Sequence, residues 1–357
     1  MSKFRYPIDT DQFEEIREKR LFYVDKTDMI YDFVNKYKYV FLARPRRFGK
    51  SLLCTTLKAY FQGEKTLFEG LKIMELEKEW NKYPVLHFDM SEMRNCRSLK
   101  DMDDVLSSML EKYETEYGTQ KQINDFGTRF SQLIRHISKS TQNKVVVIID
   151  EYDTPLMRNL YNDEMKDGIR NLLRGFYQTV KLDGAYIRFV FITGVTKFSQ
   201  LSIFSELNNL RQISMDDKYS GLCGITQEEL DTTLRPCVEE YAEALEITTE
   251  DAYALLKKNY DGYHFSPKSK DVYAPFSLLR ALEAQNTRHY WFESSTMTSL
   301  LEHLRHYPDF NSLECDGIEV GENEFDVPCE GAETPMPLLY QSGYLTIDKY
   351  ALCSLLW

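Results

Sequence analysis

Residues 49–51 have the types and the spacing of a phosphate-binding turn. Gly49, Lys50 and Ser51 follow an apolar run at 39–42 and precede apolar residues that recur at helical spacing over 52–61. Gly49 lets the backbone approach a phosphate, and the positive end of the following helix favours an anion. Lys50 has the length to reach the β- and γ-phosphate oxygens, and the Ser51 hydroxyl can bind Mg²⁺. The sequence therefore predicts a strand, a phosphate-binding loop and a helix.

The loop before Lys50 departs from the usual pattern at one position. The first glycine of G-x-x-x-x-G-K-[ST] is replaced by Arg44, so the entry to the loop must differ here. The alternative is a basic turn that contains these residues by chance. We favour phosphate binding, and the predicted binding residues are Arg44, Pro45, Arg46, Arg47, Phe48, Gly49, Lys50, Ser51 and Leu52.

A second polar group follows the most apolar run of the chain. Five consecutive β-branched residues over 145–149 predict a strand that is buried on both faces, and Asp150 and Glu151 follow directly. This is the Walker B pattern, in which Asp150 would hold Mg²⁺ next to Ser51 and Glu151 would polarise the attacking water. The alternative is a buried strand that ends in two solvated acids.

Two further polar residues, Thr193 and Asp153, belong to the candidate site. Thr193 ends an apolar run at 187–194 and is a candidate sensor of the γ-phosphate, although Thr193 and Gly194 are also typical of a plain turn. Asp153 lies in the loop after Glu151, where it either assists the site or only forms the turn. The predicted catalytic residues are Lys50, Glu151 and Thr193, and the predicted metal ligands are Ser51 and Asp150.

The composition narrows the class of protein. The net charge of −12 argues against strong direct binding of nucleic acid, whereas the basic residues around 36–50 suit a small polyanion such as a nucleotide. Seven scattered cysteines without C-x-x-C spacing suggest a reducing compartment.

The polar N-terminus lacks a secretory signal, and no apolar run approaches a membrane span, so we expect a cytoplasmic location. No metal-ligand spacing with cysteine is found for any of the six histidines, His87, His136, His264, His289, His303 and His306.

The order of the patterns predicts an α/β fold with a parallel, doubly wound sheet. Strands are expected at 39–42, 84–90, 144–149, 187–194 and 210–215, with helices between them. The candidate residues then all lie at the carboxyl ends of strands, where such sheets bind ligands. We expect this first domain to span 1–218.

Helical periodicity dominates from about residue 219, so a mainly helical C-terminal region is expected over 219–357. Thr226 and Glu229 form a capping-box pattern at the start of a helix. An apolar stretch at 338–347 is interpreted as a strand or hairpin arm. Helices are predicted at 227–235, 237–246 and 249–258, and another is predicted to start near Pro275 within the stretch 272–285.

Motifs spread over nearly the whole chain resemble the AAA-ATPase-like family of bacterial P-loop proteins. These are FYVDKT (22–27), RPRRFGKS (44–51), YPVLHFDMS (83–91), DEYDTPL (150–156), FITGVTKFSQLSIFSELNNL (191–210), YDGYHF (260–265), VYAPFSLL (272–279), YWFESS (290–295) and SGYLT (342–346). Arg44 is the family's own form of the loop, whereas Asn259 and Ala274 depart from the family's pattern.

The resemblance implies a P-loop ATPase core of the additional-strand type, with a catalytic glutamate and a helical lid-like segment. ATP and Mg²⁺ are the expected cofactors. Family members usually continue into a nuclease-like domain of the PD-(D/E)XK type, but only residues 347–357 follow the SGYLT motif here, so we carry over no nuclease activity.

Two further functional interpretations stay open at this point. The chain could be a slow nucleotide-dependent switch that presents its aromatic segment at 259–295 to a partner, or a DNA-associated defence or mobile-element factor. Besides a nucleotide, the candidate partners are a second copy of the chain or another protein. Arg46, Arg47 and Arg211 are candidate arginine fingers, and Asn208 and Asn209 are candidate contacts to nucleotide or lid.

Overall fold

The computed structural model describes residues 2–119, 125–196, 210–266, 268–288, 290, 301, 303–307, 319–329 and 332–348. The chain divides into two compact units. We call Thr27–Ala43 with Lys50–Ile213 the sheet unit, and Met1–Lys26, Arg44–Gly49 and Ser214–Trp357 the helical unit. The division at 213 lies close to the expected boundary at 218, but the N-terminal segment and the loop 44–49 group with the helical unit.

The sheet unit is built on a parallel sheet of five strands, which confirms an α/β architecture. Each of the longer expected strands is present, and the fifth is reduced to two residues. Their order is β2-β3-β4-β1-β5, with all the pairs parallel. Their bounds are β1 Tyr39–Ala43, β2 Val85–Asp89, β3 Val145–Asp150, β4 Ile187–Gly194 and β5 Arg211–Gln212.

Strand β3 is buried along its whole length, as its run of β-branched residues predicts. It pairs with β2 on one side and with β4 on the other. Strand β4 also pairs with β1, so it separates the strand before the loop from the strand that ends in Asp150.

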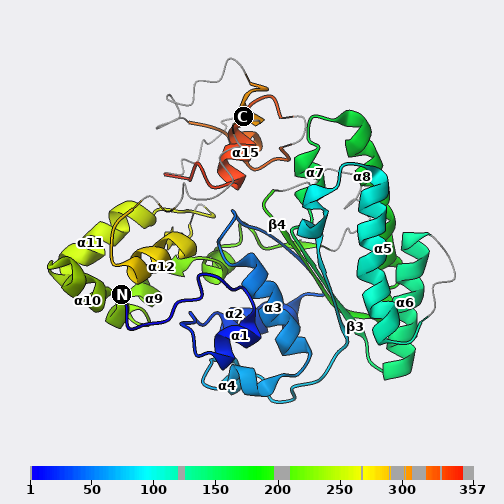
Figure 1. Cartoon of the computed structure of the whole chain (residues 1–357), viewed down its shortest axis with the longest axis horizontal. Coiled ribbons are helices and arrows are strands. Elements are labelled where there is room, and N and C mark those ends of the chain that lie inside the picture. Colours follow the sequence, from blue (N-terminus) through cyan, green and yellow to red (C-terminus); the bar gives the residue numbers. More distant parts are fainter. Residues whose placement is uncertain are drawn as a thin grey trace, which may run out of the picture. The chain divides into compact units, whose positions relative to one another are not determined.

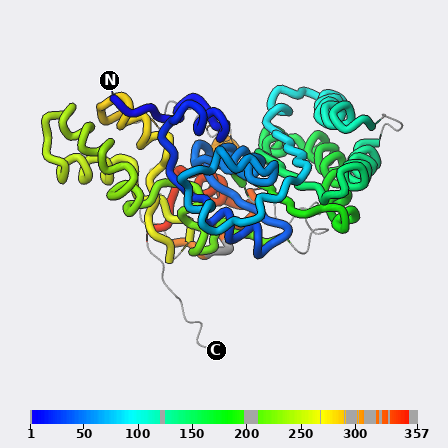
Figure 2. Tube along the Cα trace, turned by 90° about the horizontal axis from the view of Figure 1, so that it is seen from below, coloured from blue at the N-terminus to red at the C-terminus, as the bar shows by residue number. Residues whose placement is uncertain are grey.

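Helices cover both faces of this sheet (Figure 1). Helices α5, α6 and α8 run side by side on one face, as Figures 1 and 2 both show. Here Phe88 of β2 packs edge-to-face against Phe176 of α8, with ring centroids 5.2 Å apart. On the other face, Phe33 of α2 and Phe61 of α3 stack on Phe189 of β4.

Helices lie between the strands of the sheet unit, as expected. Ser98 and Asp101 form a capping box at the start of α5, which explains where that helix begins. Thr27 is the first residue of α2, and its Oγ1 accepts a hydrogen bond from the Ile73 N–H at 3.1 Å. The bounds are α2 Thr27–Lys36, α3 Lys50–Phe61, α4 Ile73–Leu76, α5 Leu99–Glu116, α6 Phe126–Thr141, α7 Thr154–Arg158 and α8 Asp163–Leu182, with 3₁₀ turns η1 Lys65–Phe68, η2 Met90–Asn95 and η3 Gly184–Tyr186.

The helical unit has its own core. It contains a small antiparallel pair, in which Ile225 of β6 is in register with Tyr273 of β7. The predicted capping box of Thr226 and Glu229 is confirmed, and Lys26 forms an ion pair with the same Glu229 at 2.5 Å. The bounds are α1 Phe13–Glu18, η4 Asp217–Leu222, β6 Ile225–Thr226, α9 Gln227–Asp231, α10 Arg235–Leu245, α11 Thr249–Tyr260, β7 Val272–Tyr273, α12 Pro275–Ala284, α14 Glu322–Phe325 and α15 Met336–Gln341.

The interpretation of 338–347 as a strand was wrong. The stretch begins inside helix α15, whose first turn contains Pro337, a residue that is well tolerated there. Gly343 has φ +88° and ends the helix in a Schellman motif: the Tyr344 N–H donates to the Leu339 carbonyl at 2.8 Å, and the Gly343 N–H to the Tyr340 carbonyl at 3.0 Å. A short apolar run followed by glycine is ambiguous between a helix end and a hairpin.

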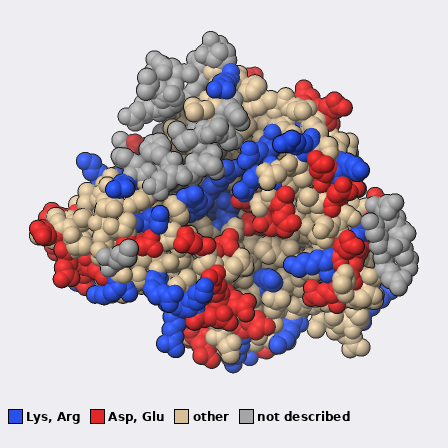
Figure 3. Space-filling model, in the orientation of Figure 1, with Lys and Arg blue, Asp and Glu red and all other residues tan. Residues whose placement is uncertain are grey.

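On the face that Figure 3 draws, acidic and basic side chains are interspersed. Among the described residues, no helix has the length and apolar character that crossing a membrane requires.

Candidate functional site

The carboxyl ends of the central strands form one edge of the sheet. Ala43 of β1 is in register with Gly194 of β4, and Asp150 of β3 with Asp89 of β2. Helix α3 begins at Lys50 and packs against β3. The topology therefore brings the start of α3 to the acidic end of β3, as the two sequence patterns predicted.

Ser51 and Asp150 are in direct contact at this edge. The Ser51 hydroxyl hydrogen-bonds to the Asp150 carboxylate, and Lys50 lies close enough to lower the pKa of that carboxylate by its charge. Asp150 is only 2% exposed. Burial is the largest influence and raises its pKa to about 6, and the negative charges of Glu151 and Asp89 add to the rise.

This arrangement favours a bound cation. The charged form of Asp150 is costly because its carboxylate is buried and faces other acids. A divalent cation would relieve that cost, and carboxylate and hydroxyl oxygens are ligands that Mg²⁺ prefers. The residues present therefore fit a Mg²⁺ ion.

Glu151 has an unusual backbone conformation. Its φ of +47° lies in the left-handed region, which costs a non-glycine residue roughly 1–2 kcal/mol. The Glu151 N–H donates to Asp150 Oδ1 at 2.9 Å. This hydrogen bond connects the bend at the end of β3 to the carboxylate of Asp150, the candidate metal ligand. The Glu151 carboxylate accepts a hydrogen bond from the Thr154 hydroxyl at 3.0 Å and pairs with Arg94 of η2 at 3.4 Å.

Asp153 is a positioning residue. It is 1% exposed, and its carboxylate accepts hydrogen bonds from the Val195 N–H and from both the N–H and the hydroxyl of Thr196. Burial raises its pKa. These bonds fasten the loop after β3 to the chain that leaves β4, which is the turn role that the sequence left open.

Thr193 lies on β4, beside β3, as expected. It is fully buried, and its hydroxyl donates to the Leu42 carbonyl of β1 at 2.7 Å. Because this bond engages the hydroxyl proton of Thr193 inside the sheet, the geometry favours a structural role for Thr193. Sensing of the γ-phosphate by Thr193 stays a prediction.

The side chain of Arg44 is buried within the helical unit. It donates to the Ser214 carbonyl at 2.6 Å and the Tyr219 carbonyl at 3.2 Å, and its guanidinium lies 3.8 Å from the centroid of the Phe265 ring. Burial lowers its pKa to about 10. The side chain of Arg44 therefore anchors the start of the loop. Of this residue, only the backbone remains suited to binding a phosphate.

The rest of the loop is anchored in the same unit. Phe48 is buried against Tyr263 and Phe265, with ring centroids 5.0 and 5.5 Å apart. Arg47 has φ +64° and holds its guanidinium over Phe276. Pro45 is buried, and Arg46, Gly49 and Leu52 are half-buried. Gly49 has φ +90°, which explains why glycine is needed there.

Three arginines were candidate fingers, and two have partners within their own unit. Besides the contact of Arg47 with Phe276, Arg211 lies over the Tyr37 ring at 5.4 Å. Arg46 contributes a positive charge near Tyr344. Asn208 and Asn209 lie outside the described residues.

Sequence reasoning missed three residues close to Asp150. Asp89 lies in the strand expected at 84–90 but was assigned no role, and no local pattern marks Cys54 of α3 or His87 of β2. The ligand atoms of Cys54, His87 and Asp150 all lie within 4.8 Å of one another. They come together only because the sheet order puts β2 beside β3 beneath α3.

The fold and the site together define an α/β protein with a parallel sheet, whose carboxyl edge brings a lysine-serine pair to a buried aspartate. A family model described as a predicted AAA-ATPase matches residues 7–204. The chain therefore belongs to the AAA-ATPase-like family, as the motifs indicated.

One curated relative extends the similarity beyond that range. It is described as "Uncharacterized protein in vnfD 5'region", from Azotobacter chroococcum mcd 1, and is 34% identical over 359 residues. The alignment covers 98% of this chain but only 65% of the relative, so the chain spans less than two thirds of that protein. No solved structure matches the chain.

Proposed function

We propose that the protein binds ATP with Mg²⁺ and hydrolyses it at the carboxyl edge of the sheet, using a P-loop. The observation that carries this proposal is the hydrogen bond between Ser51 and the buried Asp150, next to Lys50. A hydroxyl and a carboxylate that meet beside a lysine at a helix start are the parts a Mg²⁺-triphosphate site requires.

Each group has a distinct role in this proposal. Lys50 and the backbone amides at the start of the twelve-residue helix α3 bind the phosphate oxygens. Ser51 and Asp150 are the residues that would hold Mg²⁺. When bound, the ion neutralises charge on the β- and γ-phosphates.

Glu151 is the proposed group that orients the attacking water. It accepts a hydrogen bond from that water and so directs the oxygen lone pair toward the γ-phosphorus. Its strained backbone supports a functional assignment, because such strain is found preferentially at functional sites.

Steady-state phosphate release by wild type and Glu151→Gln tests the proposal. We expect wild type to release phosphate continuously and Glu151→Gln to lose most of that activity while still binding ATP. Glu164→Gln, at the start of α8, is the matched control and should behave as wild type. Equal turnover in Glu151→Gln and wild type would contradict the role of Glu151.

A slow nucleotide-dependent switch is the second candidate. The Glu151 carboxylate contacts Arg94 and Thr154. These contacts favour the switch, because they engage the carboxylate that would otherwise position the attacking water. Stoichiometric bound nucleotide without turnover would support the switch. Its partner surface would need other residues than Tyr260, Phe265 and Tyr273, whose rings are buried within the helical unit.

A further inference from the structure

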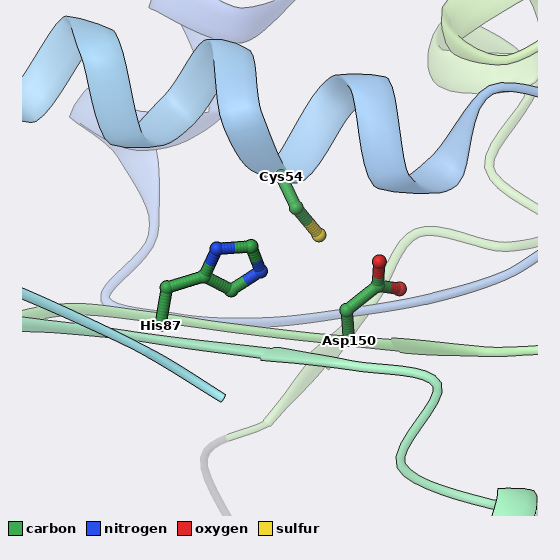
Figure 4. Close-up of side chains that lie close together, drawn as sticks. All are labelled: Cys54, His87 and Asp150. Atoms are coloured by element: carbon green, nitrogen blue, oxygen red, sulfur yellow. The ribbon is translucent and has the colours of Figure 1, made fainter. Parts of the chain in front are cut away.

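Beyond the phosphate end of the site, three side chains of different chemistry converge between α3 and the sheet. Figure 4 shows Cys54 pointing down from the helix, with His87 and Asp150 pointing up from the strands. Their thiol, imidazole and carboxylate ligand atoms lie within 4.8 Å of one another. No local sequence spacing connects them.

We propose that Cys54, His87 and Asp150 form a binding site for a thiophilic divalent cation, with Zn²⁺ as the preferred ion. Sulfur and nitrogen ligands suit Zn²⁺ and are poor ligands for Mg²⁺. Zinc sites with three protein ligands and one water are common. The usual Zn–S, Zn–N and Zn–O lengths place tetrahedral ligands about 3.3–3.8 Å apart, so closing the site requires side-chain movements of about 1 Å.

Rigid elements position the ligands. The backbone of His87 is held on both sides by one hydroxyl: Tyr113 Oη accepts from the His87 N–H at 2.8 Å and donates to its carbonyl at 2.9 Å. Cys54 is fully buried, which suits it to hold an ion and keeps it from attacking a substrate. His87 is half-buried and is the least buried of the three residues. Zinc binding displaces the Cys54 thiol proton to solvent.

The site shares one carboxylate with the proposed Mg²⁺ site. Ser51 and Cys54 are three residues apart on α3, so they share a helix face, and Asp150 contacts Ser51. A zinc ion that takes the Asp150 carboxylate therefore removes it from Ser51 and Mg²⁺. This consequence, inhibition by Zn²⁺, rests on the proposed function, whereas zinc binding itself does not.

Titration of the full chain with Co²⁺, as a spectroscopic substitute for Zn²⁺, tests binding without nucleotide. We expect one Co²⁺ with a thiolate charge-transfer band, which one equivalent of Zn²⁺ removes. Cys54→Ser should abolish the band. Cys96→Ser, which removes a more exposed thiol of the same unit, should leave it unchanged. Absence of the band in wild type, or its persistence in Cys54→Ser, would overturn the proposal.

His87→Gln is a second variant that tests the site if Cys54→Ser does not fold. It should weaken Zn²⁺ binding by at least the 10–100-fold that loss of an outer-shell group costs, whereas His136→Gln should have no effect. Equal Zn²⁺ affinity of His87→Gln and wild type would contradict the site. Cobalt binding through Cys54 in a protein without ATP turnover would support the metal site and refute the proposed function. ATP turnover in a protein that does not bind cobalt through Cys54 would support the proposed function and refute the metal site.

Discussion

Asp150 is a carboxylate whose charge the surrounding structure opposes. It is buried, lies next to Glu151 in sequence and is in register with Asp89. The Ser51 hydrogen bond and the Lys50 charge offset only part of this, since its pKa is still raised to about 6. A bound cation would therefore stabilise the charged form of Asp150.

The cost of charging the buried Asp150 predicts that, without divalent cations, Asp150→Asn changes the free energy of unfolding by an amount that depends on pH. The folded protein holds the Asp150 proton more tightly than the unfolded chain, whose carboxyl has an ordinary pKa near 3.8. The free energy of unfolding of wild type therefore falls as the pH rises from about 4 to 6, and the penalty is fully present above 6. We expect Asp150→Asn to be more stable than wild type at pH 7.5, by up to about 3 kcal/mol.

Denaturant unfolding of both proteins at pH 5, 6 and 7.5 measures this difference. The stability gained by Asp150→Asn should shrink toward low pH. A gain that does not change with pH would mean that the charge of Asp150 is not the cause.

At the residue scale, the sequence predicted the groups that lie in contiguous motifs. Lys50, Ser51 and Asp150 were found because each follows a recognisable strand or loop pattern, and the structure places Ser51 and Lys50 next to Asp150; their roles stay predictions. The convergence of Cys54 with His87 could not be predicted, because it depends on strand order and on which side chains of β2 face α3.

At the scale of elements, the last residue of β4, Gly194, is packed against the loop after β3. A Cβ on Gly194 would lie 2.5 Å from Asp153 Oδ1 and 2.6 Å from the Tyr152 ring. We expect Gly194→Ala to lower the free energy of unfolding by roughly 1–3 kcal/mol, as overpacking usually does. Gly175→Ala is the matched control, because a Cβ there meets nothing within 4 Å; in helix α8 it should be neutral or stabilising by up to about 1 kcal/mol. Similar losses in both variants would count against this packing argument.

The central strand makes a second prediction at this scale. Val147 is fully buried on β3, so Val147→Asp would place a charge where no water reaches it. We expect this variant not to fold. Leu182→Asp should fold normally, since Leu182 is 78% exposed at the end of α8. Soluble yield and thermal unfolding compare the two, and a cooperative transition in Val147→Asp would refute the burial of β3.

The sequence predicted long elements better than short ones. Continuous apolar runs identified β3 and β4, and helical spacing over 52–61 identified most of α3, because many residues contribute to each pattern. The run at 338–347 failed because α15 has only six residues, too few for the helical period to be distinguished from a strand.

At the scale of the whole molecule, the charge of the chain limits its partners. The net charge is −12, and nonspecific DNA binding depends on positive groups that release counterions from phosphates. We expect no shift of duplex DNA in an electrophoretic assay at about 50 mM salt. A shift that weakens steeply as salt is raised would revive a role in direct DNA binding.

Membership of the AAA-ATPase-like family rests on residues 7–204, which contain every group of the proposed site. The relative is covered over only 65% of its length. The activity of a longer protein therefore does not follow from this chain, and the ATP site has to be tested on the chain itself.

The most direct test of the site is an equilibrium titration with ATP, with and without Mg²⁺, of wild type, Lys50→Ala and Lys58→Ala. Lys58 lies at the opposite end of α3 and serves as the matched control. We predict Mg²⁺-dependent binding by wild type and Lys58→Ala, and a loss of about 2–3 kcal/mol, roughly 30–150-fold in affinity, in Lys50→Ala with its fold intact. Unchanged ATP affinity in Lys50→Ala would contradict the proposal that the start of α3 and the end of β3 meet around a triphosphate.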